Sequence, residues 1–323
     1  MNKAAPYVFV VTGALGFTGK CIARRLLAMG RRVRTLTGHP NRPNEFGKQL
    51  EIVPLDFRDR CALVGNLRGA ECLFNTYWVR FDHAGTSFRQ AIANTKVLID
   101  AAKEARVRKV VHISVTNASL GSHLPYFRGK AEVEAAIQQS GMRFAILRPS
   151  LIFGLGDILI NNVAWFLRRF PVFAVPGSGT YRLQPICDED VADLALHVAS
   201  EKADCTCDAV GPELVTFNQL VRLVAAQVHS KARIVHVSPR AALVLLRLLG
   251  VLVRDRILTA GEIEGLMTGL LVSSSPPSGK TRFSEWVREN GNSLGIKYAS
   301  ELARHFAKSQ SMAPSEPSCE SAQ

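Results

Sequence analysis

The chain has 323 residues, 47% of them hydrophobic, and a formal net charge of +13 at pH 7. This size and composition are those of a globular protein with room for one large domain or a domain and a lobe. The charge alone would suit nucleic acid, an anionic membrane surface or an acidic ligand. No zinc-finger spacing, helix-turn-helix pattern or basic strand with interleaved aromatic residues accompanies it, so nucleic acid is not the expected partner.

The seven cysteines are scattered and include no CxxC pair. This pattern favours reduced thiols in a cytoplasmic protein over a disulfide framework or a zinc site. Asp188, Asp190 and Asp193 are better explained as the acidic first turn of a helix than as metal ligands, so we expect no metal. We expect no signal peptide, and the longest later apolar stretch, 241–253, contains Arg247 and is too short to span a bilayer.

The first predicted element is a buried strand of β-favouring apolar residues that begins at Val8. Gly13, Gly16 and Gly19 follow it, and an amphipathic helix then runs toward Gly30. In a dinucleotide-binding turn the first glycine permits the tight turn, the second lets the backbone approach a pyrophosphate, and the third allows close helix packing. We therefore predict that the segment from Gly13 to Gly19, with Phe17 and Thr18, holds the phosphates of a nucleotide.

The second predicted strand covers residues 32–37 and leads into a proline-rich loop. In an NAD-binding unit an acid near this strand end would hold the ribose hydroxyls. Here no acid precedes Glu45, and Arg42 lies in the loop. An uncharged pocket with an arginine nearby suits a 2′-phosphate, so NADP(H) is favoured as the cofactor and NAD(H) is the alternative.

Strands and helices alternate through residue 154, which predicts a parallel, doubly wound sheet. The expected strands lie in 51–59, 71–75, 107–113 and 144–147. A short helix is expected to end at Leu67, and two further helices are expected over 94–105 and 125–139.

Tyr126 and Lys130 lie four residues apart on the helix over 125–139, so the phenol and the ammonium are expected on one face. A nearby ammonium would lower the tyrosine pKa and suit Tyr126 to proton transfer with a substrate oxygen. Ser114 and Thr116, which follow the strand over 107–113, could present a hydroxyl to that oxygen. An ordinary surface pair is the competing interpretation of Tyr126 and Lys130.

These motifs, together with Leu147-Arg148-Pro149-Ser150, Phe153-Gly154 and the segment 184–192, resemble the extended and atypical short-chain dehydrogenase/reductase superfamily. The likeness covers about residues 7–240. It is greatest for the branch of NAD-dependent epimerase/dehydratase-like proteins, NmrA-like proteins and the nucleotide-binding accessory subunit of respiratory complex I. The resemblance implies a Rossmann-type α/β fold with a smaller, mainly helical C-terminal lobe. It further implies that Asp56 and Phe57 flank the adenine and that Thr76 and Tyr77 line the cofactor channel. Asn94 would order the active-site helix. Pro149 and Ser150 would face the nicotinamide.

Two features depart from the family pattern. Thr116 precedes Tyr126 by only ten residues, and Asn75-Thr76-Tyr77-Trp78 replaces a run of small residues. Both occur in atypical members that bind a nucleotide without demonstrated turnover. Three functions therefore remain: an NADP-dependent oxidoreductase with the Tyr126–Lys130 pair, which we favour, an NAD-dependent sugar epimerase or dehydratase, and a non-catalytic NADP(H)-sensing or structural accessory protein.

The expected domains are a cofactor domain over 1–154 with a return segment at 186–210, a substrate lobe over 155–185 and 211–308, and a disordered tail at 309–323. Within the lobe, helices are expected over 163–170 and 216–228, and 171–181 is expected to be a loop. Residues 241–272 alternate apolar and basic residues, which favours a pair of lobe helices over a membrane-surface helix. Contact with a membrane or a protein complex is thus the minority interpretation.

The expected substrate is a small apolar carbonyl or quinone-like molecule. Aromatic residues are frequent in the segments that would roof the cleft, whereas Arg80 and Arg182 are the only candidates there to hold the diphosphate of a nucleotide sugar.

Overall fold

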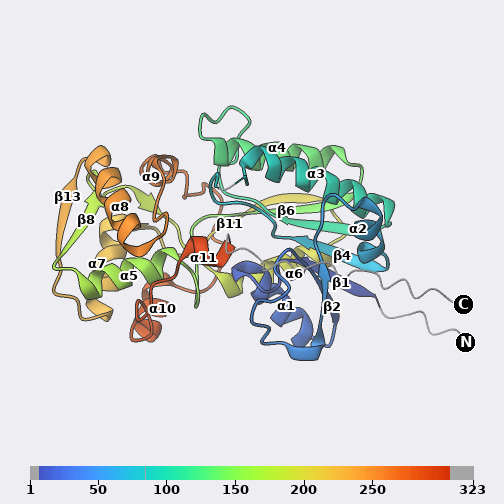
Figure 1. Ribbon diagram of the computed structural model, residues 1–323, viewed down its shortest axis with the longest axis horizontal. Coiled ribbons are helices and arrows are strands. Elements are labelled where there is room, and N and C mark those ends of the chain that lie inside the picture. Colours follow the sequence, from blue (N-terminus) through green and yellow to red (C-terminus); the bar gives the residue numbers. More distant parts are fainter. Residues whose placement is uncertain (1–6, 84, 306–323) are drawn as a thin grey trace, which may run out of the picture.

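A computed structural model describes residues 7–83 and 85–305 of the chain. Its centre is a seven-stranded sheet with the strand order β3-β2-β1-β4-β5-β6-β11 (Figure 1). The strands are β1 (Val8–Thr12), β2 (Arg32–Thr37), β3 (Leu50–Pro54), β4 (Ala70–Asn75), β5 (Lys109–Ile113), β6 (Arg143–Pro149) and β11 (Cys205–Ala209). All neighbouring pairs are parallel. The first six strands have the order of a doubly wound nucleotide-binding sheet, which confirms the predicted Rossmann-type fold.

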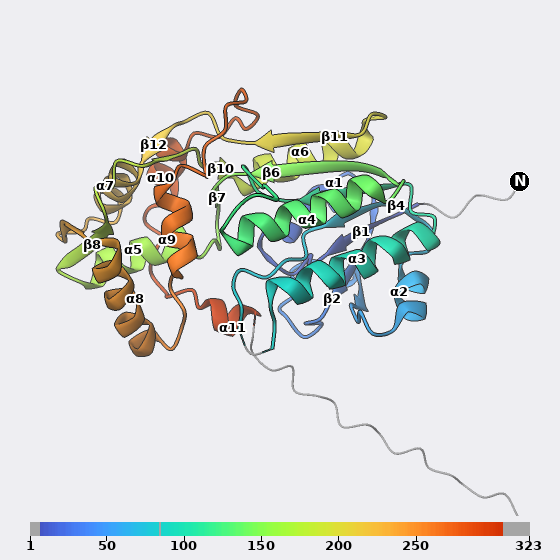
Figure 2. The same cartoon turned by 90° about the horizontal axis from the view of Figure 1, so that it is seen from above.

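Helices cover both faces of this sheet (Figure 2). They are α1 (Phe17–Ala28) and α6 (Asp188–Ser200) on one face, and α2 (Arg60–Leu67), α3 (Phe88–Glu104) and α4 (Pro125–Gln139) on the other, with a short 3₁₀ helix η1 (Gly47–Gln49) before β3. Because successive strand residues point to opposite faces, Val11 joins the apolar core under α1 and α6, whereas Val10 joins the core under α2, α3 and α4. This explains why β1 is apolar without alternation.

Local signals place most helix ends. The helix α4 begins at Pro125, as predicted, because proline at the first turn has no N–H that must be paired. The helix α3 begins at Phe88, six residues before the predicted start at Asn94. The hydroxyl of Ser87 caps α3 by accepting a hydrogen bond from the N–H of Gln90.

The remaining elements form the smaller lobe and its links to the sheet domain, seen on the left of Figure 1. They are β7 (Ile152–Phe153), α5 (Leu159–Arg169), β8 (Val172–Pro176), β9 (Arg182–Leu183), β10 (Ile186–Cys187), β12 (Val215–Thr216), α7 (Phe217–Gln227), β13 (Arg233–Val237), α8 (Pro239–Val253), α9 (Ala260–Met267), α10 (Phe283–Asn290) and α11 (Glu301–His305). Phe153 and Phe283 are fully buried where these elements meet, with their ring centres 5.1 Å apart.

The prediction that 171–181 is a loop holds for 177–181, which includes a turn at 177–179, but is wrong for 172–176. This segment contains β8, which pairs in parallel with β13, so that Phe173 lies opposite Ile234. Prolines at both ends of a short apolar run suggested a turn, but a strand partner sixty residues later supplies the backbone hydrogen bonds. Such a distant pairing leaves no local signal.

No helix in the ranges 7–83 and 85–305 is long and apolar enough to cross a membrane. The helix α11 lies between the sheet domain and the lobe in both views (Figures 1 and 2). The tail expected to be disordered, 309–323, is outside the described residues.

Candidate cofactor cleft and active site

The turn between β1 and α1 has the geometry of an anion site. Gly13 has a φ of +68°, and a Cβ at Gly19 would collide with the carbonyl oxygen of Gly13. Gly16 is the N-cap of α1 and supplies no side-chain hydrogen bond, and the first turn contains no acidic residue. The N–H groups at Phe17 and Thr18 therefore begin a helix whose positive end no side chain caps, which fits the phosphates of a nucleotide.

Arg42 lies beside this turn, since its Nη1 would be 3.9 Å from a Cβ built at Gly16. The guanidinium is half-buried and donates a hydrogen bond to the backbone carbonyl of Arg304 in α11. Burial, together with the positive charge of Arg304, lowers the pKa of Arg42. Among the residues that the structure describes, Arg42 makes no ion pair.

The nearest acid along the chain, Glu45, does not reach the same place. Its carboxylate accepts ion pairs from Lys20 at 3.2 Å and from Arg24 at 2.7 Å, both on α1. The end of β2 thus presents Arg42 without a competing carboxylate from this loop.

Several residues implied to lie along the cofactor channel are brought together. The rings of Phe57 and Tyr77 are 4.9 Å apart, and the hydroxyl of Tyr77 accepts a hydrogen bond from Asn94 Nδ2 at 2.8 Å. Thr76 Oγ1 donates to the carbonyl of Thr12 at 2.6 Å and lies 3.5 Å from a Cβ built at Gly13. The ends of β1, β3 and β4 and the first half of α3 therefore meet next to the glycine turn.

Asp56 stands apart from this group. Its carboxylate pairs with Arg58 at 2.9 Å at the surface, and hydrogen bonds from the Arg58 side chain and backbone hold the pKa of Asp56 at about 2. A role beside the adenine would require this ion pair to open.

The predicted Tyr126–Lys130 pair is separated by aromatic packing. Lys130 Nζ donates to the carbonyl of Ile113 at 2.8 Å and lies 4.7 Å from the centre of the Trp78 ring. The ring of Tyr126 packs edge-on against the rings of Trp78 and Phe88, with ring centres 6.1 Å and 6.0 Å apart. Trp78 therefore contacts both members of the pair.

The pKa directions differ from the expectation. Burial lowers the pKa of Lys130 to about 7. Burial, and next the charge of Glu262, raises the pKa of Tyr126 to about 12. The pKa of Tyr126 is therefore raised where a lowered one was expected, because burial of the phenol is the largest influence on it and Lys130 is not among the groups that shift it. The catalytic role of the pair stays a prediction.

The two hydroxyls expected near Tyr126 have other partners. Ser114 Oγ donates to Glu134, whose carboxylate also pairs with Arg148. Thr116 Oγ1 donates to the carbonyl of Leu270, in the lobe, at 2.8 Å. Each hydroxyl must give up this bond before it can donate to a substrate oxygen, although its oxygen can still accept a hydrogen bond.

Pro149 and Ser150, expected beside the nicotinamide, also hold the link to the lobe. The carbonyl of Pro149 accepts from the N–H of Thr116 at 2.9 Å, and Ser150 Oγ donates to the carbonyl of Gln184. Their position at the carboxyl end of β6 is where ligands of doubly wound sheets bind.

Sequence reasoning missed the group that closes this edge of the sheet. Arg80 pairs with Glu262 of α9 and, at 3.2 Å, with Glu301 of α11, and it also donates to the carbonyl of Ile257 at 2.8 Å. The only local signal was that Glu262 completes a capping box with Thr259. Because two carboxylates neutralise Arg80, it is not a free cation for a diphosphate. Arg182, the other candidate, is exposed on β9.

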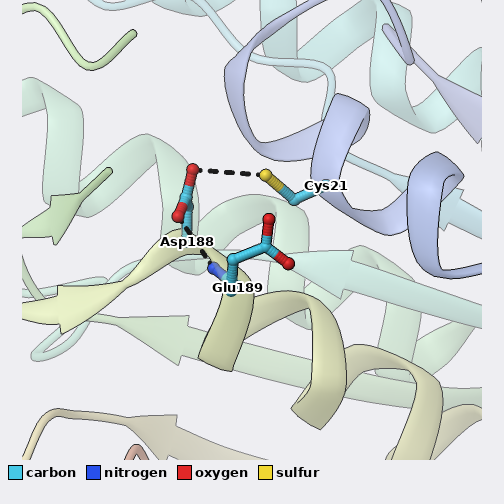
Figure 3. A group of neighbouring side chains, drawn as sticks. All are labelled: Cys21, Asp188 and Glu189. Atoms are coloured by element: carbon cyan, nitrogen blue, oxygen red, sulfur yellow. Dashed lines mark hydrogen bonds between the residues drawn. The ribbon is translucent and has the colours of Figure 1, made fainter. Parts of the chain in front are cut away.

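One group of side chains in the described ranges has metal-ligand spacing: Cys21, Asp188 and Glu189 (Figure 3). Cys21 Sγ donates to Asp188 Oδ2 at 3.2 Å, and burial raises the pKa of both groups. Glu189 pairs instead with Arg24 at 2.9 Å and with Arg25 at 3.2 Å. A protonated thiol that donates to a carboxyl group fits the packing of α6 on α1 better than a metal site does.

Comparison with known proteins agrees with this geometry. Residues 13–154 match the NAD(P)H-binding family of domains. The chain is 26% identical over 237 residues to the mitochondrial NADH dehydrogenase [ubiquinone] 1 alpha subcomplex subunit 9 of Arabidopsis thaliana, and 28% identical over 221 residues to that of Mus musculus. These alignments cover 69% and 65% of this chain but 58% and 56% of the two relatives. The chain thus spans less than two thirds of the length of these relatives.

Solved structures share the fold over most of the chain. Triphenylmethane reductase of Citrobacter sp. complexed with NADP(H) has a TM-score of 0.72 at 18% identity and covers 88% of this chain and 99% of its own. The NADPH-dependent quinone oxidoreductase of Escherichia coli complexed with NADPH has a TM-score of 0.71 at 20% identity, with 87% and 99% covered. Residues 13–154 thus match an NAD(P)H-binding domain, and with its seven-stranded parallel sheet and glycine turn the chain resembles the extended and atypical short-chain dehydrogenase/reductase superfamily.

Proposed function

We propose that this protein binds NADPH and reduces small apolar carbonyl or quinone-like compounds. The observation that carries the proposal is Arg42, placed beside an uncapped glycine turn without an acid at the end of β2. An arginine there favours a 2′-phosphate, whereas NAD would need a carboxylate for its ribose hydroxyls. The backbone from Gly13 to Gly19 would hold the pyrophosphate.

When bound, NADPH supplies a hydride to the substrate. The role of Tyr126 follows from its raised pKa, since a phenol that stays protonated at neutral pH can donate a hydrogen bond to the oxygen of a carbonyl. Trp78 and Phe88 surround this phenol with apolar surface. Lys130, buried under Trp78, would support the helix that carries Tyr126.

The neutralised Arg80 favours an apolar substrate over a nucleotide sugar. A sugar nucleotide needs several groups to grip its diphosphate, and the ion pairs to Glu262 and Glu301 leave Arg80 without that capacity. Two proteins of similar fold are a triphenylmethane reductase and a quinone oxidoreductase, which agrees with this substrate class.

A second function, NADPH binding without turnover, is favoured by a separate observation. The hydroxyls of Ser114 and Thr116 are both engaged, and Trp78 lies over Lys130. The relatives in NADH dehydrogenase suit such an accessory role within a protein complex. For the location we propose a reducing compartment, with the cytoplasm as the first choice, because the cysteines in the described ranges are free thiols.

The experiment that separates these functions measures NADPH oxidation by the purified protein with a panel of quinones and aromatic aldehydes. Reduction that falls at least tenfold in Tyr126→Phe, with NADPH binding unchanged, would support the reductase. Tight NADPH binding without oxidation of NADPH by any compound would establish the accessory function. Turnover that is equal in the wild type and Tyr126→Phe would contradict the role of the phenol.

A further inference from the structure

The helix α8 leaves most of its apolar side chains uncovered. Val244, Leu248, Val251 and Leu252 are 56%, 65%, 79% and 69% exposed, whereas the fully buried positions of α8 are Ala242 and Gly250. At 100° per residue the four exposed side chains fall within an arc of about 100° on one face. We call these four residues the α8 apolar face.

A row of arginines borders this face. Arg240, Arg247 and Arg254 are exposed and lie seven residues apart. Arg240 and Arg247 fall on one edge of α8, and Arg254 is the C-cap residue that follows its last turn. None of the three forms an ion pair with an acidic side chain among residues 7–83 and 85–305.

The charge of the surrounding segment has a single sign. Residues 214–254 include no aspartate or glutamate, and their charged residues are Arg222, Lys231, Arg233, Arg240, Arg247 and Arg254. The first acid after this segment, Asp255, has its oxygens occupied by the N–H groups of Glu301 and Leu302 and by the hydroxyl of Tyr298.

A groove adjoins the same edge of the helix. It has a volume of about 340 Å³, and both Arg247 and Arg256 line it together with Val251. Arg256 is fixed there because it donates to the carbonyl of Asp82 at 2.9 Å and lies 4.9 Å from the ring centre of Phe81. Asp255 also lines this groove, but its oxygens are occupied as described above, so arginines supply the available charge beside the α8 apolar face.

We propose that α8 docks this protein onto the surface of an anionic lipid bilayer. The four apolar side chains would enter the boundary between headgroups and acyl chains, and the arginine row would lie at the level of the phosphates. This arrangement, with apolar and basic residues on one helix and no acid among them, is the pattern of an interfacial helix. β13 lies at the end of the lobe far from the sheet domain (Figure 1), and α8 contacts β8, the strand that pairs with β13.

Residues 241–272 contain two lobe helices, α8 and α9, as the sequence predicted, and the proposal for α8 takes up the membrane-surface helix that was the minority interpretation. The alternation of apolar and basic residues over 241–272 suggested a pair of helices packed into the lobe. The structure packs α9 in this way, with Ile263 and Leu266 buried, but leaves the α8 apolar face exposed.

The test is flotation of the full-length protein with vesicles of phosphatidylcholine alone or mixed with phosphatidylglycerol. We expect binding to the mixed vesicles that weakens with salt, and much weaker binding to phosphatidylcholine. The double variant Leu248→Asp/Val251→Asp should lose binding to both. The double variant Arg247→Gln/Arg254→Gln should bind the mixed vesicles about 25-fold more weakly, from about fivefold for each arginine.

Matched controls separate the helix from general charge and stability. Arg68→Gln/Arg89→Gln removes the same charge from exposed sites on the sheet domain, and Met29→Asp places an acid at a side chain that is 59% exposed. Both should float like the wild type, and all variants should keep the wild-type melting temperature because the replaced side chains are exposed.

Three results would overturn the proposal. The first is a wild-type protein that stays in solution with both vesicle types. The second is equal binding by the wild type and Leu248→Asp/Val251→Asp. The third is concentration-dependent self-association that Leu248→Asp abolishes and vesicles do not affect, since this would assign the α8 apolar face to a second copy of the chain.

Discussion

The ammonium of Lys130 lies 4.7 Å from the centre of the Trp78 indole ring and donates a hydrogen bond to the carbonyl of Ile113. Gly129 permits this arrangement, because a Cβ there would come within 3.1 Å of the indole. A lysine expected to face a cofactor and a tyrosine is thus held beneath an aromatic side chain. The consequences of its burial can be measured.

The first prediction concerns stability and pH. Burial lowers the pKa of Lys130 from 10.5 to about 7 in the folded protein, so between these values the unfolded chain binds more protons than the folded one. The free energy of unfolding should therefore rise with pH between about 7 and 10.5. Lys130→Met should lack this contribution. In denaturant titrations the unfolding free energy of the wild type should therefore rise relative to that of the variant as the pH increases from about 7 to 10.5.

Lys103→Met, at an exposed lysine, is the matched control for the substitution. If the difference in unfolding free energy between the wild type and Lys130→Met does not change from pH 7 to pH 10, Lys130 is not the buried, uncharged group described above.

A second prediction concerns cofactor choice. Arg42→Ala should weaken NADPH binding by about 10- to 100-fold, which corresponds to the loss of a charge-assisted hydrogen bond, and should leave NADH binding nearly unchanged. Fluorescence titration of both cofactors measures this. Arg68→Ala, at an exposed arginine just after α2, should bind both like the wild type. If the wild type binds NADH as tightly as NADPH, the assignment of Arg42 to a 2′-phosphate is incorrect.

Gly16→Asp tests the phosphate site directly. The new side chain would place a carboxylate at the uncapped start of α1 and crowd the carbonyl of Gly13, from which its Cβ would be 3.1 Å away. We expect binding of both NADPH and NADH to be lost. Gly65→Asp, on α2 with no neighbour within 4 Å, is the control and should bind normally. Retained binding in Gly16→Asp would place the nucleotide elsewhere.

The ion pairs of Arg80 should matter for stability. Arg80→Met removes the guanidinium that Glu262 and Glu301 share in a mostly buried place, and we expect a loss of about 3 kcal/mol in the free energy of unfolding. The equivalent change at the exposed pair, Arg58→Met, should cost little. Denaturant titrations of both variants decide this, and equal effects would mean that solvent screens the Arg80 group as fully as a surface pair.

The sequence by itself determined the parts of this protein that depend on neighbouring residues. The glycines at 13, 16 and 19 lie between a buried strand and an amphipathic helix, and Gly13 indeed adopts the positive φ that a tight turn requires. Pro125 marked the start of α4 for a similarly local reason. The alternation of strands and helices to residue 154 predicted the parallel sheet, because a parallel pair needs a crossover helix.

The tertiary structure alone decided which distant groups share a neighbourhood. Arg80 meets Glu262 and Glu301, which lie 182 and 221 residues later, and no periodicity or spacing encodes such a meeting. Likewise, the pKa of Tyr126 depends on burial and on Glu262 more than on a lysine one turn away. The exposure of Leu248 could not be predicted from the sequence either. An amphipathic pattern shows that a helix has an apolar face, but it does not show what covers that face.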